Sequence, residues 1–181
     1  MGRAGVARVF AAILLPIDVQ AHLDEHLDAI RSARPDLRWS PPARWHLTLQ
    51  FIGECGPYEV YRQIDRWARR AQRGRPMELN LEGAGTFPKT FIARTLWAGV
   101  GGDLDAWRRV AAPDQDPHVT LARTPEKMDL TGVVDELANY RGPSWTVDQI
   151  ALVQSHLGGG PGPRYEPLEF FRLGDAESAL P

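Results

Sequence analysis

Two short segments of the chain carry the same pattern of a histidine followed two residues later by a threonine. The four residues that begin at His46 read His-Leu-Thr-Leu, and the four that begin at His118 read His-Val-Thr-Leu. In an extended strand, residues two apart point to one face, so each imidazole and its hydroxyl lie side by side. One imidazole can accept a proton while the other donates one. Thr48 and Thr120 can donate hydrogen bonds to phosphate oxygens, so the pair predicts acid–base chemistry on a phosphodiester.

The two motifs also indicate how the chain is organised. A single His-x-Thr strand is typical of a half-exposed surface histidine, and alone it would carry little functional weight. The second copy changes this, because it falls at the equivalent place of an internal repeat: helix, His-x-Thr strand, helix, strand, Gly-rich loop, strand. Two copies related by a pseudo-twofold axis would bring both motif strands together at the middle. We expect an α/β (α+β) fold with one bilobal domain over residues 1–174, a central cleft floored by both histidines, and a disordered tail at 175–181.

Hydrophobic periodicity places the remaining elements. In the first half it predicts a strand at 8–15, a helix that is capped by Asp18 and ends near 34, and a strand at 46–52 that ends at Gly53. A helix at 60–71 follows. Strands at 77–81 and 94–100 come next, and a Gly-rich loop that includes Gly83 and Gly85 joins them. In the second half it predicts a helix at 103–111, a strand at 118–122, a helix at 126–140, and strands at 145–157 and 165–173. In the strand at 46–52, the alternation puts Leu47, Leu49 and Phe51 on the core face.

The overall charge limits the kind of nucleic-acid contact that the chain can make. The formal net charge is −2 at pH 7, so no global basic field attracts a polyanion. Contact with nucleic acid should therefore be local, at a chain end or a single nucleotide. Arginine supplies nearly all of the positive charge, with Lys89 and Lys127 as the only lysines. Its planar fork suits phosphate, although a compositional bias is the simpler explanation.

Cysteine content and hydropathy indicate the cellular compartment. Cys55 is the only cysteine, which excludes an internal disulfide and a cysteine zinc site and fits a reducing, cytoplasmic setting. The apolar run at 9–17 is too short to span a bilayer, which needs about 20 residues. Pro16 within this run and Asp18 after it argue against a signal peptide. We expect a cytoplasmic protein without a membrane segment.

The chain resembles the two-histidine phosphoesterases, in particular the RNA 2′,3′-cyclic phosphodiesterases, also called 2′-5′ RNA ligases. The resemblance covers almost the whole chain and rests first on the paired motifs. The further segments that carry it are Arg8-Val9-Phe10-Ala11-Ala12, Trp39 with Pro41-Pro42, Phe51-Ile52-Gly53, Gly83, Gly85 with Phe87-Pro88, Leu96-Trp97, Gly99-Val100, Pro117, Ala122-Arg123, and residues 162–168. The last of these, Gly-Pro-Arg-Tyr-Glu-Pro-Leu, adds specificity within the superfamily.

The resemblance implies a fold and a reaction. The fold is two antiparallel sheets around a central cleft, with the helices outside. The reaction is hydrolysis of the terminal 2′,3′-cyclic phosphate of RNA or of a nucleotide to a 2′-phosphomonoester. His118 would activate water as the base and His46 would protonate the departing 3′-oxygen, roles that the spacing alone does not assign. No cofactor is implied, and two histidines facing one phosphate leave no carboxylate to complete a metal site.

Three further residues are candidates for substrate binding. The resemblance places Phe87 and Tyr165 at the cleft rim, where their rings could stack on a base. It also suggests that Arg123 reaches the phosphate. Arg123 lies five residues after His118, an odd spacing that points it to the opposite face of a regular strand. A surface ion pair is the alternative interpretation of this arginine.

The chain departs from the family pattern between Gly99 and Pro117, where it is short. The family usually has room there for a longer helix and for an aromatic residue two positions before the Pro-His pair, where this chain has Gln115. Asp114 and Asp116 would add negative charge where an RNA end approaches. We expect these differences to affect substrate affinity and size preference more than the chemistry.

Alternatives remain for the function and for a second histidine pair. The same site could join RNA ends through a 2′-5′ linkage, with a second RNA end in place of water. The lobes could also serve only to bind a nucleotide or RNA end, although the intact motifs argue against this. His22 and His26 have the four-residue spacing of a metal pair, but no third ligand is evident and a solvated helix face explains them. The expected partners are RNA 3′ ends or nucleotides with a 2′,3′-cyclic phosphate, bound by a monomer.

Overall fold

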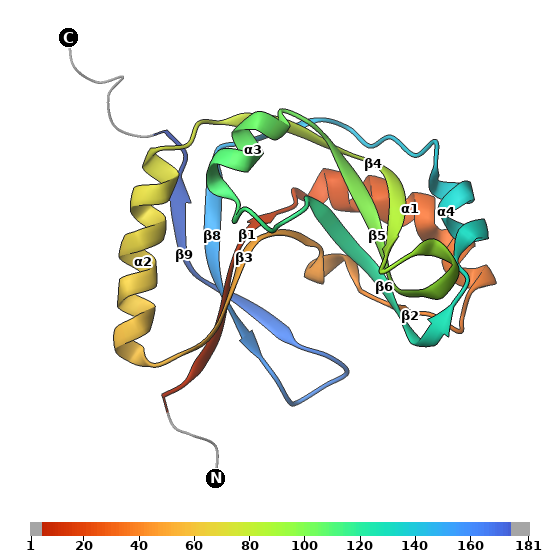
Figure 1. The fold of residues 1–181 in the computed structure, drawn as a ribbon, viewed down its shortest axis with the longest axis horizontal. Helices are drawn as coiled ribbons and strands as arrows, with labels where there is room; N and C mark the ends of the chain where they lie inside the picture. The colour runs from red at the N-terminus through yellow and green to blue at the C-terminus, as the bar shows by residue number, and fades with distance from the viewer. Residues whose placement is uncertain (1–4, 175–181) are drawn as a thin grey trace.

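Two antiparallel sheets form the body of the protein in the computed structural model, which describes residues 5–174 (Figure 1). Sheet A contains, in spatial order, β3 (His46–Cys55), β1 (Ala7–Leu14), β8 (Gln149–His156) and β9 (Arg164–Arg172). Sheet B contains β2 (Arg38–Trp39), β6 (His118–Met128), β5 (Ala93–Gly102), β4 (Met77–Phe87) and β7 (Trp145–Val147). The two motif strands, β3 and β6, contact each other at the middle of the molecule, as the internal repeat predicts.

The helices lie outside the two sheets. The long helix α2 (Pro57–Gln72) packs on sheet A, and α1 (Ile17–Ala33) and α4 (Thr131–Leu137) lie beside sheet B (Figure 1). The short helix α3 (Leu104–Val110) follows β5, and two 3-10 turns complete the set, η1 (Pro42–Arg44) and η2 (Thr90–Ile92). The mixed α/β class with two antiparallel sheets is therefore confirmed.

One continuous hydrophobic core joins the two lobes. Its buried side chains come from both sheets and from all four helices, for example Leu47, Leu121, Leu23 and Trp67. Because a domain is defined by its own core, we propose that the described residues form one bilobal domain. The expected tail at 175–181 lies outside the described residues.

Two glycines that were expected to interrupt strands lie inside them. β3 continues through Gly53 to Cys55, and Gly53 (φ +95°) lies at a shift in register against β1. Gly83 (φ +61°) lies at a similar shift within β4, where a Gly-rich loop was expected. Gly85 is also inside β4, and a Cβ atom there would lie 2.3 Å from the Trp97 ring. In this chain these glycines allow bulges and close packing.

Three other boundaries differ from the expected ones. Helix α1 begins at Ile17 with Pro16 as its N-cap, and Asp18 lies in the first turn, where its charge favours the helix dipole. The helix expected at 126–140 is shorter, because β6 extends to Met128 before α4 begins. The long strand expected at 145–157 breaks at Asp148: its first part pairs with β4 in sheet B and its second part with β1 in sheet A.

Candidate active site

A cleft of about 960 Å³ lies between the two sheets. All seven residues singled out from the sequence line it: His46, Thr48, Phe87, His118, Thr120, Arg123 and Tyr165. They come from four strands, β3, β6, β4 and β9. The cleft therefore brings together side chains that lie more than one hundred positions apart in the sequence.

Both imidazoles are held in the same tautomer. His46 Nδ1 lies 2.7 Å from the carbonyl oxygen of Arg44, and His118 Nδ1 lies 2.7 Å from that of Asp116. A carbonyl oxygen only accepts, so each Nδ1 carries the proton and donates it. Each Nε2 is then the atom that can exchange a proton in the cleft. His46 Nε2 lies 3.0 Å from the Thr48 hydroxyl oxygen, which shows that the histidine and threonine of this motif share one face.

Aromatic rings lie against both imidazoles. The centroid of the His46 ring is 4.9 Å from that of Phe10 and 5.3 Å from that of Tyr165, whose plane is perpendicular to it. The His118 centroid is 5.0 Å from that of Phe87, again with perpendicular planes, and 6.1 Å from that of Trp97. These contacts restrict the orientation of both imidazoles and remove part of their hydration.

The environment shifts the titration of His46. Burial lowers the pKa of His46 below its ordinary value, which outweighs the opposing effect of the hydrogen bond to the Arg44 carbonyl. The positive charge of His118 lowers the pKa of His46 further, so the two imidazoles are close enough to interact electrostatically. The free protein therefore favours the neutral form of His46.

A β-bulge interrupts β3 at the fourth residue of the first motif. Thr48 pairs with Ala12 and Gln50 pairs with Ala11, so Leu49 has no partner on β1. One extra residue reverses the alternation of faces beyond it.

A second bulge lies at the equivalent position of the second motif. Thr120 pairs with Trp97 and Ala122 pairs with Leu96, so Leu121 has no partner on β5. The internal repeat therefore includes the bulge. In both motifs the bulged residue, Leu49 or Leu121, is buried in the core.

The bulges bring one further side chain from each strand into the cleft. Phe51 lies three residues after Thr48, lines the cleft and is 70% exposed. The expectation that Phe51 faces the core is therefore wrong, because the bulge was not visible in the alternation. Arg123 lies three residues after Thr120 and lines the cleft despite its odd spacing from His118. It donates to the Thr95 hydroxyl at 3.4 Å and makes no ion pair within residues 5–174.

Sequence reasoning missed further cleft residues, some in strands β2, β3, β5 and β6 and others in the loops around 40–44 and 161–163. These are Arg38, Trp39, Ser40, Arg44, Phe51, Arg94, Thr95, Thr124 and residues 161–163. Arg44 joins two of these loops, because its Nη2 donates to the carbonyl oxygen of Pro161 at 2.6 Å. The Pro-rich segment at 41–44 and the Gly-rich segment at 158–163 gave no local signal that they would meet.

The shortened segment before His118 lies beside the cleft and contributes little to its lining. Neither Asp114 nor Asp116 is among the residues that line the cleft, and Gln115 lines a smaller hollow next to α3. The segment supports one of the two histidines through a hydrogen bond, in which His118 Nδ1 donates to the carbonyl oxygen of Asp116. The negative charge expected at the approach to the cleft is therefore not part of its wall.

The remaining histidines and the cysteine have structural explanations. His22 Nδ1 lies 3.0 Å from the Tyr140 hydroxyl, and the His26 ring packs on the same tyrosine, whose pKa burial raises to about 12. No group of three potential metal ligands occurs in the described part of the chain. Cys55 is buried, which raises the pKa of its thiol, and the charge of Glu59 raises it further.

Comparison with known proteins places the chain in a family. A model of the LigT-like phosphoesterases matches residues 13–97. The RNA 2′,3′-cyclic phosphodiesterase of Methanothermobacter thermautotrophicus is 31% identical over 183 residues, which cover 92% of this chain and 98% of the relative. The chain belongs to the LigT-like phosphoesterase family. The RNA 2′,3′-cyclic phosphodiesterase of Thermus thermophilus is 34% identical over 188 residues, which cover 92% of this chain and 90% of that one.

Solved structures show the same fold as this LigT-like phosphoesterase. TT0787 of Thermus thermophilus superimposes with a TM-score of 0.72 at 29% identity and covers 92% of this chain and 98% of its own. E. coli LigT without ligand superimposes with a TM-score of 0.70 at 22% identity, covering 95% and 100%. The resemblance to the two-histidine phosphoesterases is therefore confirmed. No helix in the described part of the chain is long and apolar enough to cross a membrane.

Proposed function

We propose that this LigT-like phosphoesterase hydrolyses the terminal 2′,3′-cyclic phosphate of RNA or nucleotides to a 2′-phosphomonoester. The observation that carries the proposal is the matched pair of imidazoles, each with Nδ1 bound to a carbonyl and Nε2 left for proton exchange. Relatives that align with most of the chain have the name RNA 2′,3′-cyclic phosphodiesterase. The substrate is thus an RNA 3′ end or a nucleotide.

The two imidazoles divide the proton transfers between them. Neutral His118 takes a proton from water through Nε2 as the water oxygen attacks phosphorus. Protonated His46 gives its Nε2 proton to the 3′-oxygen as the P–O3′ bond breaks, and the P–O2′ bond remains. Afterwards His118 is protonated and His46 is neutral, so proton exchange with solvent restores the starting state. The division of roles follows the resemblance to the family, and the fixed tautomers support it.

Substrate binding brings His46 into its protonated form. Burial favours neutral His46 in the free protein, whereas an anionic phosphate beside the ring favours the imidazolium. The hydroxyls of Thr48 and Thr120 donate to phosphate oxygens, and the Arg123 guanidinium compensates the developing negative charge.

The terminal nucleotide lies between the aromatic side chains of the cleft rim. Phe87 and Tyr165 were expected there, and both line the cleft together with Phe51. Their faces allow stacking of any base. We assign the active form to a monomer, because one chain supplies both histidines. The buried free thiol of Cys55 fits a cytoplasmic protein.

The test of the function is turnover of adenosine 2′,3′-cyclic phosphate. We expect adenosine 2′-monophosphate as the product, identified by chromatography against the 2′ and 3′ standards. A 3′-monophosphate product would reverse the assigned orientation of the substrate. Absence of turnover on both this nucleotide and an RNA with a cyclic phosphate end would contradict the proposed function.

A further inference from the structure

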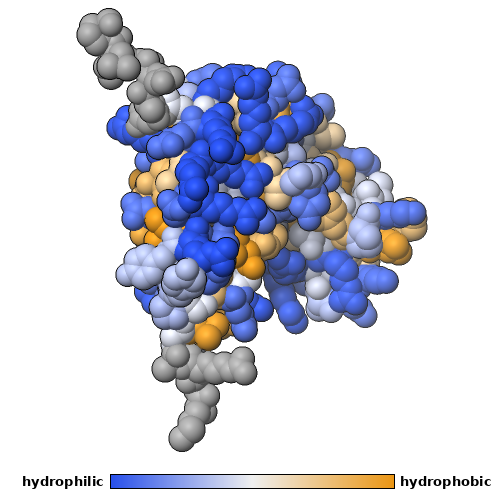
Figure 2. All heavy atoms as spheres, turned by 60° about the vertical axis from the view of Figure 1, so that its left-hand side comes forward, coloured by the Kyte–Doolittle hydropathy of each residue, from blue (hydrophilic) through white to orange (hydrophobic). Residues whose placement is uncertain are grey.

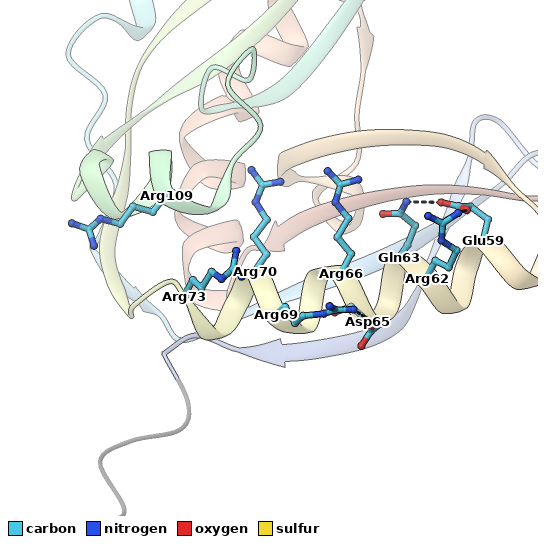
Figure 3. Close-up of a pocket in the computed structure, with 9 residues that line it drawn as sticks. All are labelled: Glu59, Arg62, Gln63, Asp65, Arg66, Arg69, Arg70, Arg73 and Arg109. Atoms are coloured by element: carbon cyan, nitrogen blue, oxygen red, sulfur yellow. Dashed lines mark hydrogen bonds and ion pairs between the residues drawn. The ribbon is translucent and has the colours of Figure 1, made fainter.

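A second hollow, lined mainly by arginine, lies on the side of the molecule that carries α2. Its volume is about 580 Å³, and two acidic residues, Glu59 and Asp65, are among its lining side chains. Its arginines are Arg62, Arg66, Arg69, Arg70 and Arg73 from α2 and Arg109 from α3. Figure 3 shows these side chains, and we call this hollow the arginine groove. Figure 2 turns this side of the molecule forward and shows a mainly hydrophilic surface there.

The arginines of α2 form a continuous row. Arg62, Arg66, Arg70 and Arg73 follow one another at spacings of four, four and three residues, which places them on one face of the helix. The row is about 16 Å long at the rise of an α-helix. Figure 3 shows the Arg66 and Arg70 side chains extending in the same direction from the helix. The row can therefore contact successive groups of one extended ligand.

The positive charge of the groove is only partly compensated within the protein. Arg62 lies 3.4 Å from Glu59, and Arg69 pairs with Asp65. Arg66, Arg73 and Arg109 make no ion pair within residues 5–174.

One arginine is held rigidly at the wall of the groove. Arg70 Nη2 donates to the carbonyl oxygen of Ala111 at 2.8 Å, and its guanidinium lies 4.9 Å from the centre of the Trp67 ring. Burial lowers the pKa of Arg70, and the charge of Arg66 lowers it further. The like charges repel one another, so an anionic ligand would relieve an unfavourable interaction already present in the free protein.

The groove lies beside the strand that carries His46. β3 is the outer strand of sheet A. The amide of Ala112 donates to the carbonyl of Leu49 at 2.8 Å, and Ala112 directly follows Ala111, whose carbonyl accepts from Arg70 of the groove. The wall of the groove is therefore attached to the outer edge of β3, whose cleft face carries Phe51. A chain that leaves the cleft past Phe51 and crosses this edge meets the groove.

Exposed aromatic residues lie at the start of the same helix. Tyr58 and Tyr61 are 77% and 73% exposed and precede the first arginine of the row. Exposed aromatic rings at the end of a row of arginines are compatible with binding of single-stranded nucleic acid, because bases can stack on the rings while the arginines contact the backbone.

We propose that the arginine groove binds the sugar–phosphate backbone of single-stranded RNA, upstream of the terminal cyclic phosphate in the cleft. The inference rests on the proposed function and adds a second contact region to it. Guanidinium forks bind phosphate oxygens through paired hydrogen bonds. The small net charge of the whole chain does not oppose this, because six arginines are gathered at this one groove. RNA contact thus extends beyond the terminal nucleotide.

The test compares two substrates of different length. Arg66→Ala combined with Arg73→Ala should leave kcat/KM for adenosine 2′,3′-cyclic phosphate unchanged, because a mononucleotide in the cleft does not reach the groove. For a single-stranded oligoribonucleotide with the same cyclic end, we expect kcat/KM to fall about tenfold. For the oligoribonucleotide, the slope of log KM against the logarithm of the salt concentration should fall by about 1.4, since each of the two lost phosphate contacts contributes about 0.7 to this slope.

Two control variants separate charge from position. Arg66→Lys combined with Arg73→Lys keeps the charge and should retain most of the activity on the oligoribonucleotide. Arg108→Ala removes an exposed arginine of α3 that pairs with Asp105 and does not line the groove. This variant should leave kcat/KM unchanged for both substrates. An unchanged kcat/KM for the oligoribonucleotide in the Ala variant, or equal losses on both substrates, would overturn the proposal.

A binding measurement keeps the groove separate from the chemistry. Fluorescence anisotropy with an oligoribonucleotide that ends in a 2′-phosphate should show weaker binding to the Ala variant than to the wild type. The difference in affinity is expected even if the wild type turns over neither substrate. Absence of turnover would contradict the proposed function but not the proposed groove. Equal affinities of the two proteins would reject RNA as the ligand of the groove.

Discussion

Phe51 and Arg123 occupy equivalent positions in the two lobes. Each lies three residues after its motif threonine and enters the cleft because a bulge precedes it. Phe51 pairs with Phe10 on β1, whereas Arg123 pairs with Thr95 on β5. At this pair of positions the symmetry is kept by the backbone and broken by the side chains, because one lobe supplies an aromatic ring and the other a guanidinium. A substrate with a flat base and a charged phosphate fits this difference.

Substitution of Phe51 and substitution of Arg123 should have different effects on KM and kcat. Phe51→Ala should raise KM for a cyclic nucleotide about tenfold with little change in kcat, because it removes a stacking surface. Arg123→Gln should mainly lower kcat, because it removes charge that stabilises the transition state. Phe91→Ala is the matched control, since Phe91 is 60% exposed and lies outside the cleft. Identical effects of Phe51→Ala and Arg123→Gln on kcat would be inconsistent with this division.

Loss of either cleft histidine should nearly abolish turnover without unfolding the protein. We expect His46→Ala and His118→Ala each to lower kcat about 10²- to 10⁴-fold. His156→Ala is the control, because His156 pairs with Glu166 outside the cleft. Circular dichroism and thermal melting should show folded proteins in every case. Near wild-type rates in both cleft variants would contradict the assignment.

The acid and base roles should respond differently to the leaving group. A substrate with a good leaving group needs little protonation, so His46→Ala should retain much more activity on it than His118→Ala does. The comparison requires kcat/KM for a series of esters of falling leaving-group pKa. Equal sensitivity of the two variants would show that the roles are not divided in this way, even if both histidines are essential.

Acid should destabilise the protein partly through His46. Burial lowers the pKa of His46 in the folded state, whereas the unfolded chain has a histidine pKa of about 6.5. The contribution of His46 to stability is therefore greatest above about pH 6.5 and is lost as the pH falls toward the lowered value. Thermal melting of the wild type and of His46→Gln between about pH 5 and 8 measures this. The wild type should lose more stability at the acid end; parallel curves would contradict the shift.

Turnover should not need a divalent cation. Among residues 5–174, histidine, threonine and arginine side chains line the cleft and no carboxylate does, and the reaction is assigned to proton transfer by the two histidines. Dialysis against a chelator should leave kcat/KM unchanged. Activity that disappears in chelator and returns with added magnesium or manganese would refute this assignment.

The local pattern of the sequence was enough to place the motif strands and to predict that both motif histidines line one cleft. The His46 and His118 motifs can be recognised from the alternation of polar and apolar residues and from their repetition. The bulges at Leu49 and Leu121 were not predictable, because an unpaired residue is defined by the neighbouring strand. For this reason Phe51 was assigned to the wrong face.

Contacts between segments that are distant in the sequence were also not predictable from the local pattern. The apolar run at 145–157 reads as one strand, because both of its halves are buried, and only pairing shows that Asp148 divides it between the sheets. The contact of Arg44 with Pro161 joins two loops that lack periodicity. The arginine row of α2 was present in the sequence, but the hollow that it lines also needs Arg109 from α3.

The division of the chain at Asp148 has a consequence for biosynthesis. Sheet A combines strands from the two ends of the sequence, with β1 between β3 and β8. The first lobe therefore lacks two of its four strands until residues 149–172 have left the ribosome. Because domains fold as units once their strands are available, sheet A and the active site are completed only near the end of synthesis. A chain truncated after the second motif would possess both histidines and still lack two of the four strands of the sheet that carries the first one.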